Sequence, residues 1–274
     1  MAAYCSPMPN SAELRLHTRF RSAQLDATRT IAVLLPPGYE EDRFRRYPVL
    51  YLQDGQNLFP ATSPLGKDWK LDTIIPELIQ SKAIEPLIVA GIFHGDVQRI
   101  DELTPTHDKR EARGGRAELY ERMLIEEVMP FVRTRYRIRT GPQATGIGGS
   151  SLGGLVSLWI AFRHPELFGG VAALSPSVWW DRRRLVRDVR KLRSRPPVRA
   201  WVSVGTSEGR SGAPAVRALR DAMLGAGWLL GKDLRYHEER GAGHDELAWS
   251  AVVEPALRFL FPVRASDLGG LERL

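Results

Sequence analysis

The sequence predicts an α/β protein built on a mostly parallel, doubly wound sheet with an antiparallel hairpin at its N-terminal end. From Glu13 to about Leu35 polar and apolar residues alternate, which is typical of two antiparallel strands with one face in water. The later apolar runs are continuous, as in strands that are buried on both faces. Stretches with apolar residues three and four apart separate these runs, and this spacing predicts helices that cover the sheet.

The predicted elements alternate along the chain. The buried strands are expected at 49–53, 87–93, 144–148, 170–174, 198–204 and 234–239. The helices are expected at 71–80, 117–135, 152–163, 183–192, 214–224 and 247–261. Functional groups of such sheets gather where loops leave the carboxyl ends of the strands, so candidate site residues are sought in those loops.

Length and composition are those of an ordinary globular protein. We expect a single α/β domain over residues 1–274, with a loose N-terminus over 1–10. The single cysteine, Cys5, excludes a disulfide framework and a thiolate metal cluster. No apolar run approaches the roughly 18–20 residues of a membrane span. The N-terminus lacks the basic start and apolar stretch of a signal peptide, so a cytoplasmic location is expected.

The formal net charge of +7 is concentrated in the segment 181–199, where nine basic residues stand against two acidic ones. Four apolar residues make a narrow stripe there, which predicts a surface helix with a basic outer face: Leu185, Val186, Val189 and Leu192. A charge run is usually a solvated face, but this segment follows a sheet strand, where a cap that favours anionic substrates is the alternative. The rest of the chain is formally neutral, and we expect no nucleic-acid partner.

A G-x-S-x-G pattern, Gly149-Ser150-Ser151-Leu152-Gly153, stands between a predicted buried strand and a predicted helix. A nucleophile on such a sharp turn has strained dihedrals, so the residues two positions away must lack side chains if strand and helix are to approach. Ser151 meets this requirement, whereas Ser150 has Leu152 two positions after it. The pattern predicts Ser151 as the nucleophile; the alternative is a Gly/Ser-rich turn without chemistry.

A serine nucleophile needs a base, and an imidazole base is commonly oriented by a carboxylate. His244 lies in a glycine-containing loop before the last helix, where the base belongs when the chain order is serine, acid, histidine. Glu208 follows the end of a predicted strand between the two and is the expected acid. Asp181 and Asp233 are rivals for this role, and a dyad of Ser151 and His244 alone is a further alternative.

Two backbone amides are expected to hold the oxyanion of an acyl-transfer reaction. One belongs to Leu152, the residue after the nucleophile, and the other to Gln56, in the loop after the strand 49–53. Gly55 permits a close backbone approach in that loop. Loss of one such donor typically costs on the order of 3 kcal/mol in the transition state.

Several segments of the chain, taken in order, resemble those of one known family. They include YPVLYLQDGQNLF, PLIVAGIFHG, QRIDELTPTHD, TGIGGSSLGGLVSLW, RHPELFGGVAALSPSVWW and the GHDE loop. From about Leu34 to Phe261 the chain resembles the esterases related to enterochelin esterase and S-formylglutathione hydrolase, within the α/β-hydrolase superfamily. The resemblance implies the α/β-hydrolase fold, a serine hydrolase with its triad at the positions above, and neither a metal nor an organic cofactor.

Two segments provide candidate substrate contacts. The segment 95–116 is long for a loop, and Arg99 and Arg116 are candidates within it. Its charges nearly cancel, so ion pairs that hold its shape are an equal alternative. Trp180, next to Trp179, is a candidate wall of an acyl or aromatic pocket, or else an anchor of its loop.

These residues favour hydrolysis of carboxylic esters through an acyl-enzyme on Ser151. The expected substrate is a small ester, such as a short acyl ester or a siderophore lactone, and a negative charge on it is one option. Acyl transfer to an alcohol by the same triad is an alternative. A non-catalytic anion-binding protein on this fold is an alternative of another class, and the intact order of serine, acid and histidine argues against it. The sequence predicts no oligomeric state.

Overall fold

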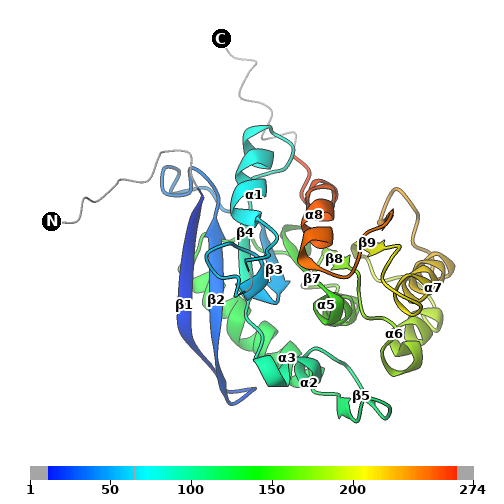
Figure 1. Cartoon of the computed structure of the whole chain (residues 1–274). Coiled ribbons are helices and arrows are strands. Elements are labelled where there is room, and N and C mark those ends of the chain that lie inside the picture. Colours follow the sequence, from blue (N-terminus) through cyan, green and yellow to red (C-terminus); the bar gives the residue numbers. More distant parts are fainter. Residues whose placement is uncertain (1–11, 65, 264–274) are drawn as a thin grey trace.

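The computed structural model of the chain describes residues 12–64 and 66–263. Its centre is one eight-stranded sheet with helices on both sides, as Figure 1 shows. The segment 1–10, predicted to be loose, lies outside the described residues, and so does Cys5.

The strands agree with the predicted runs to within two residues at each end. They are β1 (Glu13–Ser22), β2 (Ala27–Leu35), β3 (Val49–Gln53), β4 (Ile88–Ile92), β7 (Thr145–Ser150), β8 (Gly170–Leu174), β9 (Arg199–Gly205) and β10 (Leu234–Glu239). Their order in the sheet is β1-β2-β4-β3-β7-β8-β9-β10. The pairs β1–β2 and β2–β4 are antiparallel, and every pair from β4 to β10 is parallel. The predicted mostly parallel sheet with an antiparallel N-terminal hairpin is therefore confirmed.

The long helices also follow the predicted periodicity. They are α1 (Leu71–Gln80), α3 (Ala117–Arg122), α4 (Met129–Arg135), α5 (Ser151–Arg163), α6 (Trp180–Arg190), α7 (Gly212–Gly225) and α8 (Glu246–Leu260). A π-helical stretch, Met123–Val128, joins α3 to α4, so the predicted helix 117–135 is continuous but changes its hydrogen-bond pattern. Short 3₁₀ turns occur at Gly55–Asn57, Asp96–Gln98 and Pro142–Ala144. No helix among the described residues is long and apolar enough to cross a membrane.

The segment 95–116, expected as a long loop, contains structure of its own. A short helix, α2 (Arg99–Glu102), precedes a small hairpin of β5 (His107–Asp108) and β6 (Arg113–Gly114). Asp101 ties the segment together, because its carboxylate accepts a hydrogen bond from the Gly114 amide at 2.6 Å and lies 3.7 Å from the Arg113 guanidinium. With two residues per strand, the hairpin is too short to produce a recognisable alternation in the sequence.

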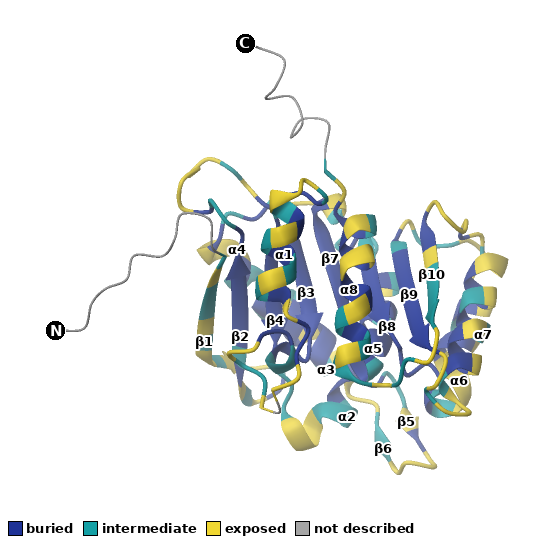
Figure 2. Cartoon of the chain, turned by 45° about the horizontal axis from the view of Figure 1, so that its top comes forward, coloured by how far each residue is buried: buried dark blue, intermediate teal, exposed yellow. Residues whose placement is uncertain are grey.

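The sheet divides the interior into two apolar layers. In β3, Val49 and Tyr51 pack into one layer and Leu50 and Leu52 into the other, as the two-residue period of a strand requires. One layer is covered by α1 and α8, and the other by the helices from α3 to α7. Figure 2 shows the result: the inner strands are largely buried, the edge strands β1 and β10 are only partly buried, and α1 and α8 each present an exposed outer face.

The basic segment 181–199 forms most of α6 and the chain that follows it. The helix opens with a left-handed turn, in which Asp181, Arg182 and Arg183 have φ between 44° and 61°. Leu185, Val186 and Val189 are buried, and most of the segment's basic residues are exposed. Three of the four residues of the predicted stripe are therefore buried beneath a solvated basic face, whereas Leu192 lies beyond the end of α6 and is exposed.

Gly55 lies where the loop after β3 crosses the end of β4. A Cβ atom on Gly55 would come within 2.6 Å of the carbonyl carbon of Gly91, which is far inside van der Waals contact with backbone. This contact sets how closely the loop that carries Gln56 can approach the sheet.

We expect Gly55→Ala to lower the free energy of unfolding by about 1–3 kcal/mol, because the added methyl group must push backbone apart. Gly225→Ala is the matched control, since no atom lies near a Cβ at this last residue of α7. The control should leave stability unchanged or raise it by up to about 1 kcal/mol, as alanine favours helix. Urea denaturation midpoints measure both; equal midpoints for the two variants would contradict the steric argument.

Candidate active site

The turn between β7 and α5 holds Ser151 in a strained backbone conformation. Ser151 has φ of 54°, in the left-handed region that non-glycine residues rarely adopt. A Cβ on Gly149 would lie 2.8 Å from the carbonyl carbon of Gly153, and a Cβ on Gly153 would lie 2.8 Å from Cβ of Gln53. Both glycines predicted from the motif are thus required by close packing. Strain of this kind costs about 1–3 kcal/mol and is typical of functional sites.

The three residues predicted to act together lie in one hydrogen-bonded row. Nε2 of His244 is 2.9 Å from Oγ of Ser151, and Nδ1 of the same ring is 2.9 Å from Oε2 of Glu208. Ser151 begins α5, Glu208 follows β9, and His244 precedes α8, so three separate loops at the carboxyl edge of the sheet supply them. The His244 side chain is 39% exposed, whereas the Glu208 side chain is 2% exposed.

This row determines the proton positions. A carboxylate only accepts hydrogen bonds, so the proton of a neutral His244 ring sits on Nδ1 and faces Glu208. The lone pair of Nε2 then faces Ser151, whose hydroxyl donates to it. The arrangement is the one that general-base activation of a serine hydroxyl requires.

Glu208 is held by donors on the side away from His244. Its Oε1 accepts hydrogen bonds from the Gly205 amide, at 2.6 Å, and from the Ser175 hydroxyl. The Ser175 oxygen in turn accepts from Nε1 of Trp249 at 3.0 Å. A carboxylate buried with these donors remains a satisfied acceptor, which offsets the cost of removing its charge from water.

The two rival carboxylates lie elsewhere. Asp233 accepts a hydrogen bond from the Leu229 amide and lies 2.9 Å from the guanidinium of Arg195. Asp181 is in the left-handed turn of α6, and its amide donates to Asp108. Of the three candidates, only Glu208 contacts His244 in the described part of the chain.

Three neighbours of the row were not predicted from the sequence. Ser177 places its Oγ 3.2 Å from Oγ of Ser151, and its amide donates to the Ser151 carbonyl at 2.9 Å. Because Ser151 donates its one proton to His244, Ser177 is the donor between the two hydroxyls. Trp249 packs edge-on against the His244 ring, with ring centres 5.1 Å apart. The signal for Ser175 and Ser177 was present: two hydroxyl residues directly after β8, at the carboxyl edge of the sheet.

The two amides expected at an oxyanion both lie in first turns. Leu152 is the second residue of α5, and Gln56 is the middle residue of a 3₁₀ turn, so neither N–H has a partner within its own helix. Gln56 is fixed on both sides, because its side-chain Oε1 accepts from the His94 amide at 3.3 Å and its carbonyl accepts from the Thr62 hydroxyl at 3.1 Å. The N-terminus of α5 adds a favourable dipole for a negative charge.

The two predicted arginine contacts have different surroundings. Arg99 forms a two-point ion pair with buried Asp54, whose carboxylate oxygens accept from Nε and Nη2 at 2.7 and 2.8 Å. The same carboxylate packs against the nucleophile turn, because a Cβ on Gly153 would lie 3.0 Å from Oδ2 of Asp54. Arg99 thus supports the nucleophile turn through Asp54, and its side chain is 24% exposed. Arg116 is exposed and precedes α3, where its amide donates to the Asp101 carbonyl.

His94 is a further titratable group beside the Gln56 loop. Its Nδ1 accepts a hydrogen bond from the Asp96 amide at 2.9 Å. Burial lowers the pKa of His94 below its ordinary value, which favours the neutral ring. In that form the ring proton sits on Nε2.

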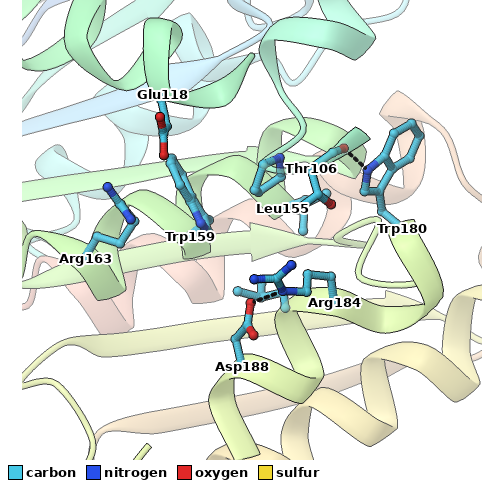
Figure 3. Close-up of a pocket in the computed structure, with 10 residues that line it drawn as sticks. Thr106, Glu118, Leu155, Trp159, Arg163, Trp180, Arg184 and Asp188 are labelled. Carbon is cyan, nitrogen blue, oxygen red and sulfur yellow. Dashed lines mark hydrogen bonds and ion pairs between the residues drawn. The ribbon is translucent and has the colours of Figure 1, made fainter. Parts of the chain in front are cut away.

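Trp180 is buried, and its indole N–H donates to the Thr106 carbonyl at 2.9 Å. It also lines a cavity between α5, α6 and the segment after α2, shown in Figure 3. Trp180 therefore anchors its loop and also lines this cavity, and its role as the wall of a substrate pocket stays a prediction. Among the described residues, no group of three or more His, Cys, Asp or Glu side chains is arranged to hold a metal ion.

Comparison with known proteins identifies a family for this chain. Residues 22–260 match the family described as "Putative esterase". An uncharacterized protein of Bacillus subtilis, YbbA, is 27% identical over 187 residues, which are 66% of this chain and 70% of that protein. The iron(III) salmochelin esterase of Escherichia coli O6:H1 is 31% identical over 200 residues, which are 65% of this chain and 46% of that protein. The chain thus spans less than half the length of the latter relative.

Two solved structures share the fold. A ferulic acid esterase superposes with a TM-score of 0.73 at 21% identity, covering 93% of this chain and all of that one. The enterobactin esterase from Shigella flexneri superposes with a TM-score of 0.71 at 22% identity, covering 93% of this chain and 60% of that one. These likenesses identify the α/β-hydrolase fold. With the family match over most of its length, the chain belongs to the "Putative esterase" family of carboxylic ester hydrolases.

Proposed function

We propose that this chain hydrolyses carboxylic esters through an acyl-enzyme on Ser151, with His244 as base and Glu208 as the orienting acid. The observation that carries the proposal is the unbroken row of two 2.9 Å contacts, from Ser151 Oγ to His244 and from His244 to Glu208. Family membership supports the reaction class.

In the first half of the reaction, Oγ of Ser151 attacks the carbonyl carbon while its proton passes to Nε2 of His244. The buried Glu208 carboxylate stabilises the imidazolium that forms. The amides of Leu152 and Gln56 donate to the new oxyanion. When the tetrahedral species collapses, the ester C–O bond breaks and the alkoxide takes the proton from His244. Water then repeats these steps on the acyl-enzyme and releases the acid.

The proposed substrate is a small carboxylic ester. Relatives named for feruloyl and siderophore esters make a short or aryl ester and a siderophore lactone the first substrates to try. A negative charge on the substrate and a cytoplasmic location remain predictions. Acyl transfer to an alcohol would use the same groups, and no described contact favours it over hydrolysis.

Ser151→Ala should lower kcat for p-nitrophenyl acetate by at least about 10⁴-fold, because Ser151 carries the hydroxyl that contacts Nε2 of His244 and would form the acyl-enzyme. The fold should be retained, since only a hydroxyl is removed from a half-buried site. The hydrolysis rate of the purified variant is the measurement, and its thermal unfolding midpoint is the control for folding. Turnover that is unchanged in the variant would eliminate Ser151 as the nucleophile.

Glu208→Gln tests whether catalysis needs the carboxylate of Glu208 or only the dyad of Ser151 and His244. Loss of the carboxylate should lower kcat by about 10³–10⁴-fold, because the amide favours the wrong ring tautomer and cannot balance the imidazolium. Glu239→Gln is the matched control: Glu239 also contacts a histidine, His237 at 2.9 Å, outside the row. The control should keep its rate within about twofold. A decrease below tenfold in Glu208→Gln would instead favour the Ser151–His244 dyad.

Ser175→Ala should lower kcat by about 10–100-fold, because Glu208 loses a charge-assisted hydrogen bond and Trp249 loses its acceptor. KM should change little, since Ser175 is buried and supports the acid instead of facing solvent. Ser203→Ala is the control: Ser203 is also buried and lies on the neighbouring strand β9, and its hydroxyl has no hydrogen-bond partner among the described residues. Equal kinetic effects in the two variants would show that Ser175 has no specific role.

A further inference from the structure

The loop after β8 contacts Ser151 at two points. The amide of Ser177 donates to the Ser151 carbonyl at 2.9 Å, and Oγ of Ser177 lies 3.2 Å from Oγ of Ser151. Ser177 is only 3% exposed, so its side chain is almost completely removed from water. The hydroxyl of Ser177 is therefore a buried neighbour of the oxygen atom that the proposed reaction uses as its nucleophile.

This hydroxyl has one acceptor for its proton. Among the described residues, Ser151 is the only hydrogen-bond partner of Oγ of Ser177. The proton of Ser151 is directed to Nε2 of His244, 2.9 Å away, so the Ser177 hydroxyl donates and the Ser151 oxygen accepts. No hydrogen bond joins Ser177 to His244 in the described part of the chain, so Ser177 has no base of its own and is not a second nucleophile.

The backbone around Ser177 is fixed on both sides. On one side, Pro176 packs against α5, because a Cβ on Gly154 would lie 3.2 Å from Cβ of Pro176. On the other side, the Ser177 carbonyl accepts a hydrogen bond from the Trp180 amide at 3.0 Å. The donor is thus in position before a substrate arrives, which is the condition under which a hydrogen bond stabilises a transition state without a reorganisation cost.

The contact from Ser177 leaves the Ser151 oxygen one free lone pair. A serine hydroxyl has one proton and two lone pairs. The proton of Ser151 points to His244 and one lone pair accepts from Ser177, so the other lone pair is the one that can attack a carbonyl carbon. As the proton passes to His244, negative charge builds on Oγ, and a charge-assisted hydrogen bond is about twice as strong as a neutral one. The contact therefore stabilises the transition state more than the ground state.

We propose that Ser177 is a further catalytic residue, whose hydroxyl donates to the Ser151 oxygen, directs its attack and stabilises the charge that develops on it. The inference rests on the proposed function of Ser151 and His244. In the attack, the bond from Oγ to the carbonyl carbon forms, the Ser151 proton moves to Nε2 of His244, and the Ser177 proton stays on its own oxygen. When water hydrolyses the acyl-enzyme, the same bond breaks, Oγ regains a proton from His244, and Ser177 again donates to the leaving oxygen.

Three substitutions of Ser177 separate the effect of its hydroxyl from that of its volume. Ser177→Ala and Ser177→Val should lower kcat/KM for p-nitrophenyl acetate about 10–100-fold, because a donor to the developing charge is lost. Ser177→Thr has the shape of Ser177→Val but keeps the hydroxyl, so its kcat/KM should be at least about tenfold higher than that of Ser177→Val. Ser203→Ala, which also removes a buried hydroxyl, should stay within about twofold of the unmodified enzyme. Equal losses in the threonine and valine variants, or no loss in the alanine variant, would overturn the proposal.

A second measurement needs only Ser177→Ala, which adds no atom to the buried site. Phenylmethylsulfonyl fluoride reacts with a serine oxygen in one attack step, so its rate of inactivation reports on Oγ of Ser151 without deacylation. Ser177→Ala should lower this rate by about the same factor as kcat/KM for the acetate, while the thermal unfolding midpoint shows that the fold is kept. An unchanged rate of inactivation would also overturn the proposal.

The same experiments distinguish this inference from the proposed function. If Ser151→Ala keeps full turnover, the proposed function fails, and the role of Ser177 fails with it. If Ser151→Ala is inactive but Ser177→Ala keeps full activity, the proposed function stands and only the role of Ser177 is refuted.

Discussion

The left-handed turn at Ser151 is the constraint on which the rest of the site depends. With φ of 54°, the residue exposes its hydroxyl at the end of β7 and starts α5 immediately afterwards. That conformation is available only because Gly149 and Gly153 let strand and helix approach to within backbone contact. Buried Asp54, in its ion pair with Arg99, packs behind the same turn. Close backbone packing thus surrounds the turn where the chemistry requires a fixed oxygen atom.

The parallel sheet brings together catalytic residues that are far apart in the sequence, which is the second requirement of the site. The loops after β8, β9 and β10 leave the same edge, so their residues can interact although dozens of positions separate them. The loop after β8 has a central position, because Ser175 supports Glu208 while Ser177 contacts Ser151. Backbone pairing fixes this loop against β9, where the Ser175 amide donates to the Ser203 carbonyl at 2.8 Å. Register errors in the sheet would therefore separate the acid from the nucleophile.

The basic segment 181–199 and the catalytic residues are separate features of this molecule. The excess of arginine in 181–199 forms the solvated face of α6, while the side of α6 that meets α5 carries Leu185 and the Arg184–Asp188 pair. A strongly basic segment next to a site therefore need not make the site basic, because ion pairs and helix periodicity decide which charges face inward.

The sequence by itself determined the strands, the long helices and the glycine pattern around Ser151, because burial on one or both faces leaves a local period of two or 3.6 residues. It also placed Gln56, Glu208 and His244 in loops at one edge of the sheet. Only the tertiary structure decided which of three carboxylates lies beside His244, and that Ser175, Ser177 and Trp249 surround the row. It also decided the hairpin within 95–116 and the cavity beside Trp180. The hairpin is local, but its strands are too short to show a period. The other features arise from contacts between segments far apart in the chain, and such contacts leave no periodic trace in the sequence.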